Sequence, residues 1–184
     1  MGGSSVIRRL ERKKLEWAEQ EAVQRRAAAY AMLFAAQVGD FRVTQWAIEK
    51  MGANPNTRES TVLPSVHSAL RYVSITSARD VAAHKKTVEV LLDHGADVNM
   101  RDHEGRGALA AAIDRGCVEI VELLLDRGAA ITDVDRVAGG RNVIEYVADQ
   151  RGRDERIVDV LRNRYPVMFL DIWTAMNAPT LNGV

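Results

Sequence analysis

Apolar residues recur at helical spacing in several stretches of the chain, and short glycine-containing segments separate these stretches. In residues 118–125, apolar side chains occupy positions 118, 121, 124 and 125, while Glu119 and Glu122 lie between them. This spacing predicts an amphipathic helix that buries one face. A shorter, alanine-rich helix is expected over residues 108–113, and the turn Arg115-Gly116 follows it. The sequence therefore predicts an antiparallel pair of helices.

The same arrangement occurs three times along the chain. Each copy ends in a Gly-Ala pair, which begins at Gly52, Gly95 and Gly128, so these glycines are 43 and 33 residues apart. A glycine at this place supplies the left-handed residue that ends the second helix. Self-similarity with such a period indicates stacked helical units. The second unit carries an insertion of about ten residues, and its alignment stays open between Leu63 and Ala83. We expect residues 73–78 to lengthen the connection between its two helices.

The N-terminal segment is predicted to form one long helix. Between Val6 and Val38 there is no glycine or proline, and residues with high helix propensity dominate. We expect this helix to begin near Ser5 and to run through the first helix of the first unit. A heptad frame starting at Leu10 and Trp17 places charged residues in the seam, so an extended coiled-coil homodimer is not favoured.

The outer part of this helix, residues 8–14, carries five positive charges and one negative charge. Two interpretations stay open. The segment could be a basic arm that binds nucleic acid, an acidic partner or a membrane surface. Alternatively, it is a solvated helix that caps the first unit. We favour the second interpretation, because the acids between Glu11 and Glu21 dilute the positive charge.

The end of each unit carries the most specific sequence signal. The segment Gly95-Ala96-Asp97-Val98-Asn99 is followed by Gly105-Arg106, and Gly52-Ala53-Asn54-Pro55-Asn56 ends the first unit in the same way. These motifs resemble ankyrin repeats, and the resemblance covers roughly residues 28–165. It implies an all-α solenoid of helix-turn-helix units with short fingers between them. A weaker fourth unit fits through residues 143–148 and 157–161.

This resemblance suggests the organisation of the whole chain. We expect an N-terminal charged helical extension over residues 1–27, continuous with the first repeat. The repeat array would follow over residues 28–165, in units of approximately 28–57, 58–100, 101–137 and 138–165. Residues 166–184 would form an apolar capping helix and a flexible tail.

The family's Thr-Pro-Leu-His motif is missing from the sequence. Its place is taken by Gly107-Ala108-Leu109-Ala110 in the third unit. In the family, the threonine caps the first helix and the histidine forms hydrogen bonds between neighbouring units. Their absence would remove about 1 kcal/mol each, so we expect a somewhat loose array.

The C-terminal end is unusually apolar. Pro166 ends the last predicted helix, and the segment from Val167 to Met176 that follows is strongly apolar. Such a surface needs a cover. We expect it to cap the open face of the fourth unit. The alternative is that it binds a partner or a second copy of the chain, but a homo-oligomer through this segment is not favoured.

Composition narrows the remaining possibilities. Lys and Arg total 25, and Asp and Glu also total 25, so the whole chain has no charge that would favour nucleic acid. A single cysteine, Cys117, excludes an internal disulfide framework, and no apolar run reaches the length of a membrane span. We therefore expect a soluble intracellular protein, cytoplasmic or nuclear. Lipidation is disfavoured because Val6 stands where an N-myristoylation motif requires Ser or Thr.

No motif predicts catalysis, a cofactor or a metal. The four histidines are His67, His84, His94 and His103, and none has a partner at metal-site spacing. There is no phosphate-binding loop or nucleophile elbow. We expect a chain that is not an enzyme and binds no cofactor. A small-molecule enzyme with its site near Ser74 to His84 is a distant alternative.

The family resemblance implies a surface that binds a protein partner through fingers and first helices. The candidate partner-binding residues are Arg58, Arg71, Tyr72, Met100, Arg101, His103, Arg106, Asp114, Arg115, Arg136, Arg141 and Asp149. Arginine is frequent among them, and acids are interleaved, which favours a mixed-charge protein over nucleic acid. The main alternative function is an assembly or regulatory subunit that docks on an enzyme, or on itself, through residues 167–176.

Overall fold

The computed structural model describes residues 3–57, 65–70, 78–131, 143, 155–167 and 170, with side chains from Arg9 onward. Within these residues the chain forms helices and no strand. The named helices are α1 (Gly3–Gln37), α2 (Phe41–Met51), α3 (Ser65–Leu70), α4 (Ala78–Asp93), α5 (Ala108–Asp114), α6 (Val118–Asp126) and α8 (Glu155–Arg164).

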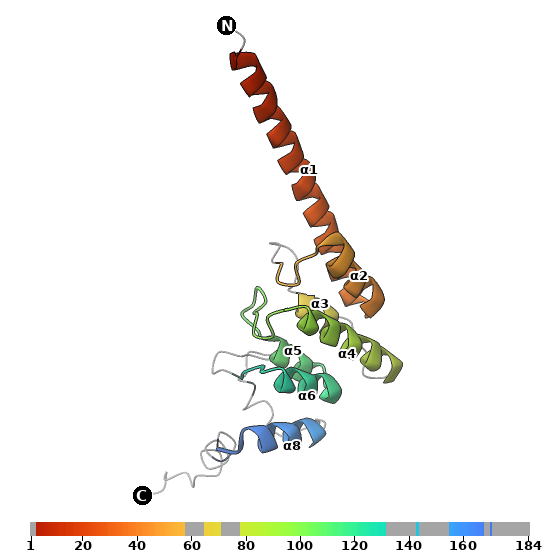
Figure 1. Ribbon diagram of the computed structural model, residues 1–184. Coiled ribbons are helices and arrows are strands. Elements are labelled where there is room, and N and C mark those ends of the chain that lie inside the picture. The colour runs from red at the N-terminus through yellow and green to blue at the C-terminus, as the bar shows by residue number, and fades with distance from the viewer. Residues whose placement is uncertain are drawn as a thin grey trace, which may run out of the picture.

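The helices are arranged in two layers (Figure 1). In one layer the C-terminal part of α1 is followed by α3 and α5, and in the other α2 is followed by α4, α6 and α8. We call the pairs α1/α2, α3/α4 and α5/α6 units 1, 2 and 3. Helix α8 lies beside α6, in the place of the second helix of a fourth unit. The predicted all-α solenoid of helix pairs is confirmed.

The core lies between the layers and continues from unit to unit. In α6, the predicted positions Val118, Val121, Leu124 and Leu125 are at most 5% exposed, as the helical spacing predicted. The turn between α1 and α2 is short, and α2 is capped at both ends. In unit 1, the Asp40 carboxylate accepts hydrogen bonds from Arg42 N and Val43 N, both at 3.1 Å, and so begins α2. At the other end, Gly52 ends α2 in the left-handed conformation with φ +70°.

Asparagines link consecutive units at the predicted unit ends. Asn56 Nδ2 donates to Gly95 O at 2.8 Å, and its Oδ1 accepts from Asp97 N at 2.7 Å. Asn99 repeats both bonds one unit further, to Gly128 O at 3.3 Å and from Ala130 N at 2.9 Å. Each asparagine therefore satisfies two main-chain groups of the next unit and fixes the spacing between units.

A histidine also links units 2 and 3, so the expectation that this link is missing is wrong for unit 2. His67 Nε2 donates to Arg106 O at 2.9 Å, and the His67 side chain is 3% exposed. The expectation that the first helix lacks a side-chain cap is confirmed for unit 3, because Gly107 precedes α5 without a side-chain hydrogen bond. The array is therefore held together better than the missing motif suggests.

The long N-terminal helix is confirmed, with 35 residues. Every residue from Arg9 to Ala27 is exposed, whereas Ala28 and Met32 are fully buried. This helix therefore extends beyond the array (Figure 1). The expectation that the extension caps unit 1 is wrong, because residues 9–27 are solvated without covering it.

The insertion in unit 2 lies partly inside a helix. Helix α4 has 16 residues, compared with 11 in α2 and 9 in α6. The extra residues extend its beginning, which includes Ala78 of the predicted longer connection, while residues 73–77 of that connection lie outside the described part of the chain. The insertion thus lengthens the second helix of the unit.

At the C-terminal end, α8 buries Ile157, Val158 and Leu161. Tyr165 Oη donates to Ala129 O at 3.3 Å and joins this end to unit 3. The predicted capping helix over residues 167–176 lies mostly outside the described residues. The exposed fractions of the two residues described there are 71% for Val167 and 62% for Leu170.

Candidate functional site

The best-defined candidate site is the finger between units 2 and 3, residues 96–107. Its tip is a tight hairpin, in which Arg101 and Gly107 form an antiparallel bridge. Asp102 N donates to Arg106 O at 3.0 Å, and Gly105 N donates to Asp102 O at 3.1 Å. Gly105 has φ +77°, a conformation that glycine adopts without strain. The hairpin therefore projects from the start of α5 with a defined backbone.

A buried carboxylate holds this hairpin together. The Asp102 side chain is 1% exposed. Its Oδ1 accepts from Glu104 N at 2.9 Å and Arg106 N at 2.8 Å, and its Oδ2 accepts from Arg106 Nε at 3.1 Å. Burial alone would raise the pKa of Asp102, but the hydrogen bonds and charge of Arg106 outweigh burial and hold this pKa below its usual value of 3.8. Asp102 is therefore ionised at neutral pH.

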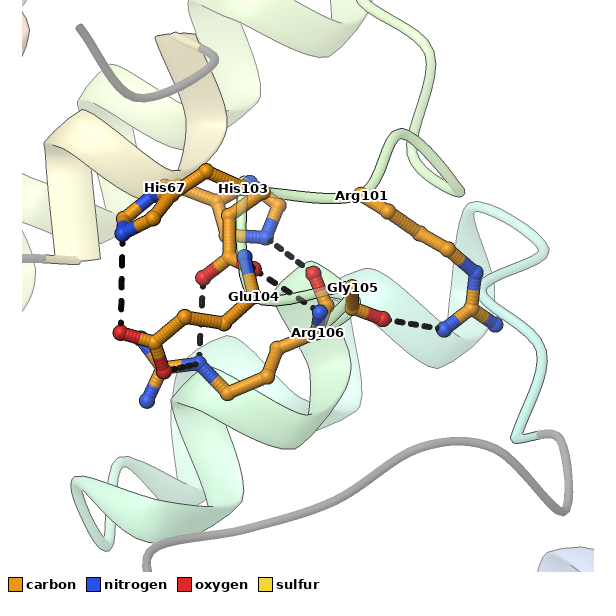
Figure 2. Close-up of polar contacts among 7 residues, drawn as sticks. His67, Arg101, His103, Glu104, Gly105 and Arg106 are labelled. Carbon is orange, nitrogen blue, oxygen red and sulfur yellow. Dashed lines mark hydrogen bonds and ion pairs between the residues drawn. The ribbon is translucent and has the colours of Figure 1, made fainter. Parts of the chain in front are cut away.

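The polar side chains around this carboxylate are held in place (Figure 2). Arg106 Nε also pairs with Glu104 Oε2 at 3.2 Å, while Arg101 Nη1 donates to Gly105 O at 2.6 Å. The two arginines extend to opposite sides of the finger in this view. His103 and Glu104 form the exposed tip, with side chains 72% and 55% exposed. The finger thus presents both signs of charge on a fixed backbone.

The structure brings together only some of the predicted partner-binding residues. Met100, Arg101, His103 and Arg106 all lie in the finger. Asp114 and Arg115 lie at the opposite end of α5, roughly 10 Å along the helix axis, and only Arg115 is exposed. The remaining candidates lie outside the described residues: Arg58, Arg71, Tyr72, Arg136, Arg141 and Asp149.

Two residues that organise the finger were not among the predicted site residues. Asp102 has the local pattern of a turn-forming residue, with Gly105 three positions later. His67 contacts the finger from α3, through Arg106 O. Its role was missed because the alignment of unit 2 was open in this region. His67 in fact stands where Ala110 stands in unit 3.

Cys117 and the histidine and acidic side chains are the candidates for nucleophilic or metal chemistry in the described residues. Burial raises the pKa of the Cys117 thiol to about 11, so this thiol stays protonated and unreactive at neutral pH. In the described residues, no three His, Cys, Asp or Glu side chains cluster as metal ligands would. No helix in the same residues is long and apolar enough to cross a membrane.

Comparison with known proteins identifies the family. A family model described as "Ankyrin repeats (3 copies)" matches residues 32–135, more than half of the chain. The chain belongs to the ankyrin-repeat family. The match includes units 2 and 3 and the finger between them. Ankyrin repeats generally mediate protein–protein interactions and are typically not catalytic.

Several curated proteins are similar over parts of the chain. The E3 ubiquitin-protein ligase XBAT33 of Arabidopsis thaliana is 29% identical over 122 residues, which cover 66% of this chain and 22% of that protein. The B-cell lymphoma 3 protein homolog of Mus musculus is 30% identical over 96 residues, 52% of this chain and 20% of its own length. Ankyrin repeat domain-containing protein 63 of Mus musculus is 46% identical over 46 residues, 25% of this chain and 12% of that protein. The chain thus spans about a fifth or less of these relatives.

Proposed function

We propose that this protein is a non-catalytic binding module that recognises a protein partner through its fingers and first helices. The observation that carries the proposal is the finger of residues 96–107. Its backbone is fixed by the buried Asp102 carboxylate and by His67, while His103 and Glu104 are exposed at its tip. A rigid, polar projection of this kind is suited to recognition of a protein surface.

Rigidity matters because ordering a loop on binding costs free energy. An immobilised side chain costs about 0.5 to 1.5 kcal/mol, and a loop that is already ordered avoids part of this cost. In this finger, Arg101 is held by Gly105 O and Arg106 by Asp102 before any partner arrives. The interleaved charges of Arg101, Glu104 and Arg106 favour a mixed-charge protein partner over nucleic acid.

Variants of the finger test this proposal. Arg101→Glu combined with His103→Glu removes a positive charge from the finger and adds two carboxylates. Arg106 is left unchanged because its guanidinium holds Asp102. Arg162→Glu on α8 is the matched control, since Arg162 is exposed and far along the chain from the finger. We expect affinity capture from the native cell extract, quantified by mass spectrometry, to lose a protein with the finger variant and to retain it with the control.

Circular dichroism must show that both variants keep the helical content and melting temperature of the parent. A partner captured equally by parent, finger variant and control would contradict recognition by this finger.

The intracellular location of this protein, cytoplasmic or nuclear, stays a prediction.

The enzyme alternative is not favoured. His84 is the histidine nearest the insertion, and it is 5% exposed. Its Nδ1 donates to Asp80 O at 2.8 Å, and its Nε2 lies 3.4 Å from Gln37 O in unit 1. The imidazole is therefore engaged in packing units 1 and 2 together. Docking through residues 167–176 stays the second candidate, supported by the exposed side chains of Val167 and Leu170.

A further inference from the structure

The first unit exposes an apolar face at the N-terminal end of the array. In α2, Val43 is 42% exposed and Trp46 is 53% exposed, and in α1 Phe34 is 68% exposed. Val38, in the turn between these helices, is 56% exposed. Array ends normally carry polar surfaces, because each unit buries its apolar face only against its neighbours. The exposed apolar residues of unit 1 are therefore unusual for the end of an array.

In the later units, a neighbouring helix covers the positions that are exposed in unit 1. Positions are equivalent when counted from Gly39 in unit 1, Ala83 in unit 2 and Gly116 in unit 3; Gly39 and Gly116 lie in the turns of their units, whereas Ala83 lies within α4. The positions equivalent to Val43 and Trp46 are at most 9% exposed in the later units: Thr87, Val90, Ile120 and Leu123. In those units, α4 packs against α2 and α6 packs against α4. Unit 1 has apolar residues at these positions too, but no helix of the described residues packs against them, so its face is exposed.

Helix α1 carries an apolar seam beside this face. Val23, Ala27, Tyr30 and Phe34 are all exposed, and they are spaced by four, three and four residues. This spacing places them along one side of the helix, as in a heptad seam. The opposite side of α1, at Met32 and other core positions, is buried. The seam therefore faces away from the array. The frame through Leu10 and Trp17, which is disfavoured by its charges, lies on another side.

The face is large enough to form an interface. Tyr30, Phe34 and Trp46 expose between 47% and 68% of their surface. Because aromatic side chains bury about 150 to 250 Å² each, these three expose on the order of 300 Å². Apolar patches of a few hundred Å² mark interaction sites. With the neighbouring valines, burial of this face in two molecules approaches the roughly 1,200 Å² of a specific interface.

The sequence of α1 favours a second copy of this chain, in antiparallel orientation, as the cover. A parallel pair would place Arg9, Lys13 and Glu16 beside their own copies, which is repulsive. An antiparallel pair centred between Ala27 and Tyr30 avoids these contacts. In that register the seam pairs apolar with apolar residues. Glu16 then lies near the start of α2 in the second copy, where Arg42 is exposed.

We infer that the apolar face of unit 1, made by Val23, Tyr30, Phe34, Val38, Val43 and Trp46, is the interface of an antiparallel homodimer. Residues 9–27, which precede unit 1 in this chain, form the exposed part of helix α1 and do not cover this face. This inference is independent of the proposed function, which concerns the finger.

The oligomeric state tests the inference. We expect the full chain to have twice its mass of 20.4 kDa in sedimentation and light scattering, at roughly 10 to 100 µM, where a modest interface is populated. Phe34→Glu should make it monomeric. Since the substitution removes one buried ring from each copy, the dissociation constant should rise at least about 100-fold.

Two controls distinguish this interface from other apolar surfaces. Leu15→Glu introduces the same charge at an exposed residue of α1 outside the seam, with Leu15 65% exposed, and should leave the dimer intact. Val167→Glu with Leu170→Glu tests the C-terminal segment and should also leave it intact. A monomeric parent would overturn the inference. So would a dimer that survives Phe34→Glu, or one that is lost only in the variant with Val167→Glu and Leu170→Glu.

Crosslinking tests the orientation. A cysteine at Gln20 would meet its own copy in a parallel dimer, whereas in the antiparallel register the two copies of residue 20 are roughly 25 Å apart. We expect Gln20→Cys to form a disulfide when mixed with Gln37→Cys, but not by itself. The native Cys117 is buried and should not interfere. Efficient self-crosslinking of Gln20→Cys would rule out the antiparallel arrangement.

Discussion

Replacing Asp102 with alanine is the most direct test of how the finger is held. The substitution removes a buried carboxylate that accepts hydrogen bonds from Glu104 N and Arg106 N and pairs with the Arg106 guanidinium. Two main-chain donors then lose their protein acceptor. A hydrogen bond to a charged group contributes about 1.5 to 3 kcal/mol. Because water can reach the emptied site, we expect a total loss of about 2 to 3 kcal/mol in the free energy of unfolding.

Urea denaturation followed by circular dichroism measures this loss, and the melting temperature should fall by roughly 4 to 12 °C. Asp97→Ala is the matched control. The Asp97 carboxylate accepts from Asn99 N at 2.9 Å in a similar turn, but the residue is exposed. Its replacement should cost about 1 kcal/mol or less. A loss below about 0.5 kcal/mol for Asp102→Ala would refute the proposed role of the buried carboxylate.

The difference in the free energy of unfolding between the parent and Asp102→Ala should also depend on pH, and this dependence gives an independent check. The pKa of Asp102 in the folded state lies below its usual value of 3.8. The unfolded chain therefore binds the proton more readily, and the ionised carboxylate stabilises the fold at all pH values above about 4. As the pH falls from 4 through the folded-state pKa, this contribution is lost. The stability difference between the parent and Asp102→Ala should accordingly be constant near neutrality and shrink in acid.

Two further predictions concern other parts of the array. Gly39→Ala should destabilise the protein by about 1 to 3 kcal/mol, and more than Gly52→Ala, as measured by urea denaturation. Both glycines have positive φ, but a Cβ at Gly39 would lie 3.0 Å from the His84 ring while one at Gly52 meets nothing within 4 Å; equal losses would contradict this. The Cys117 thiol, with its pKa raised to about 11, should react slowly with a thiol reagent at pH 7.5 in the native protein and rapidly in urea, and fast native labelling would show that the site opens.

The repeating units could be predicted from sequence because their signals are local. The spacing of Val118, Val121 and Leu124 specifies a helix with one buried face, and Gly128 marks its end. The unit ends could also be located, because Asn56 and Asn99 stand in the same place in two units. Helix formation and helix ending depend on neighbours within a few residues. These features therefore follow from the sequence of each unit alone.

The hydrogen bonds between units could not be predicted so directly. His67 reaches Arg106 O only when the insertion of unit 2 is placed after it, and the sequence left that placement open. The network around Asp102 forms with its carboxylate buried, and this burial is a property of the folded array that the local sequence does not specify. A local sequence pattern indicates that such residues can form a turn. It does not indicate which groups of another unit they will meet.

The exposure of the apolar face of unit 1 could not be predicted from the sequence either. Val43 and Trp46 follow the same helical pattern as Ile120 and Leu123, yet the first pair is exposed and the second is buried. The periodicity identifies the apolar side of a helix, but the neighbouring unit decides whether that side is covered. The exposure of this face therefore follows from the stacking of the units, and not from the sequence of unit 1 alone.

The two proposed surfaces lie on different parts of the array, so their functions can be separated and also combined. A dimer formed through unit 1 leaves the finger of residues 96–107 available in both copies. Two linked fingers raise the local concentration of the second site once the first is bound, so a partner with two recognition segments would bind more tightly. Phe34→Glu would then weaken binding of such a bivalent partner while leaving the affinity for a single segment unchanged. The finger variant with Arg101→Glu and His103→Glu would weaken both. This difference separates a role in dimerisation from a role in recognition within a single binding assay.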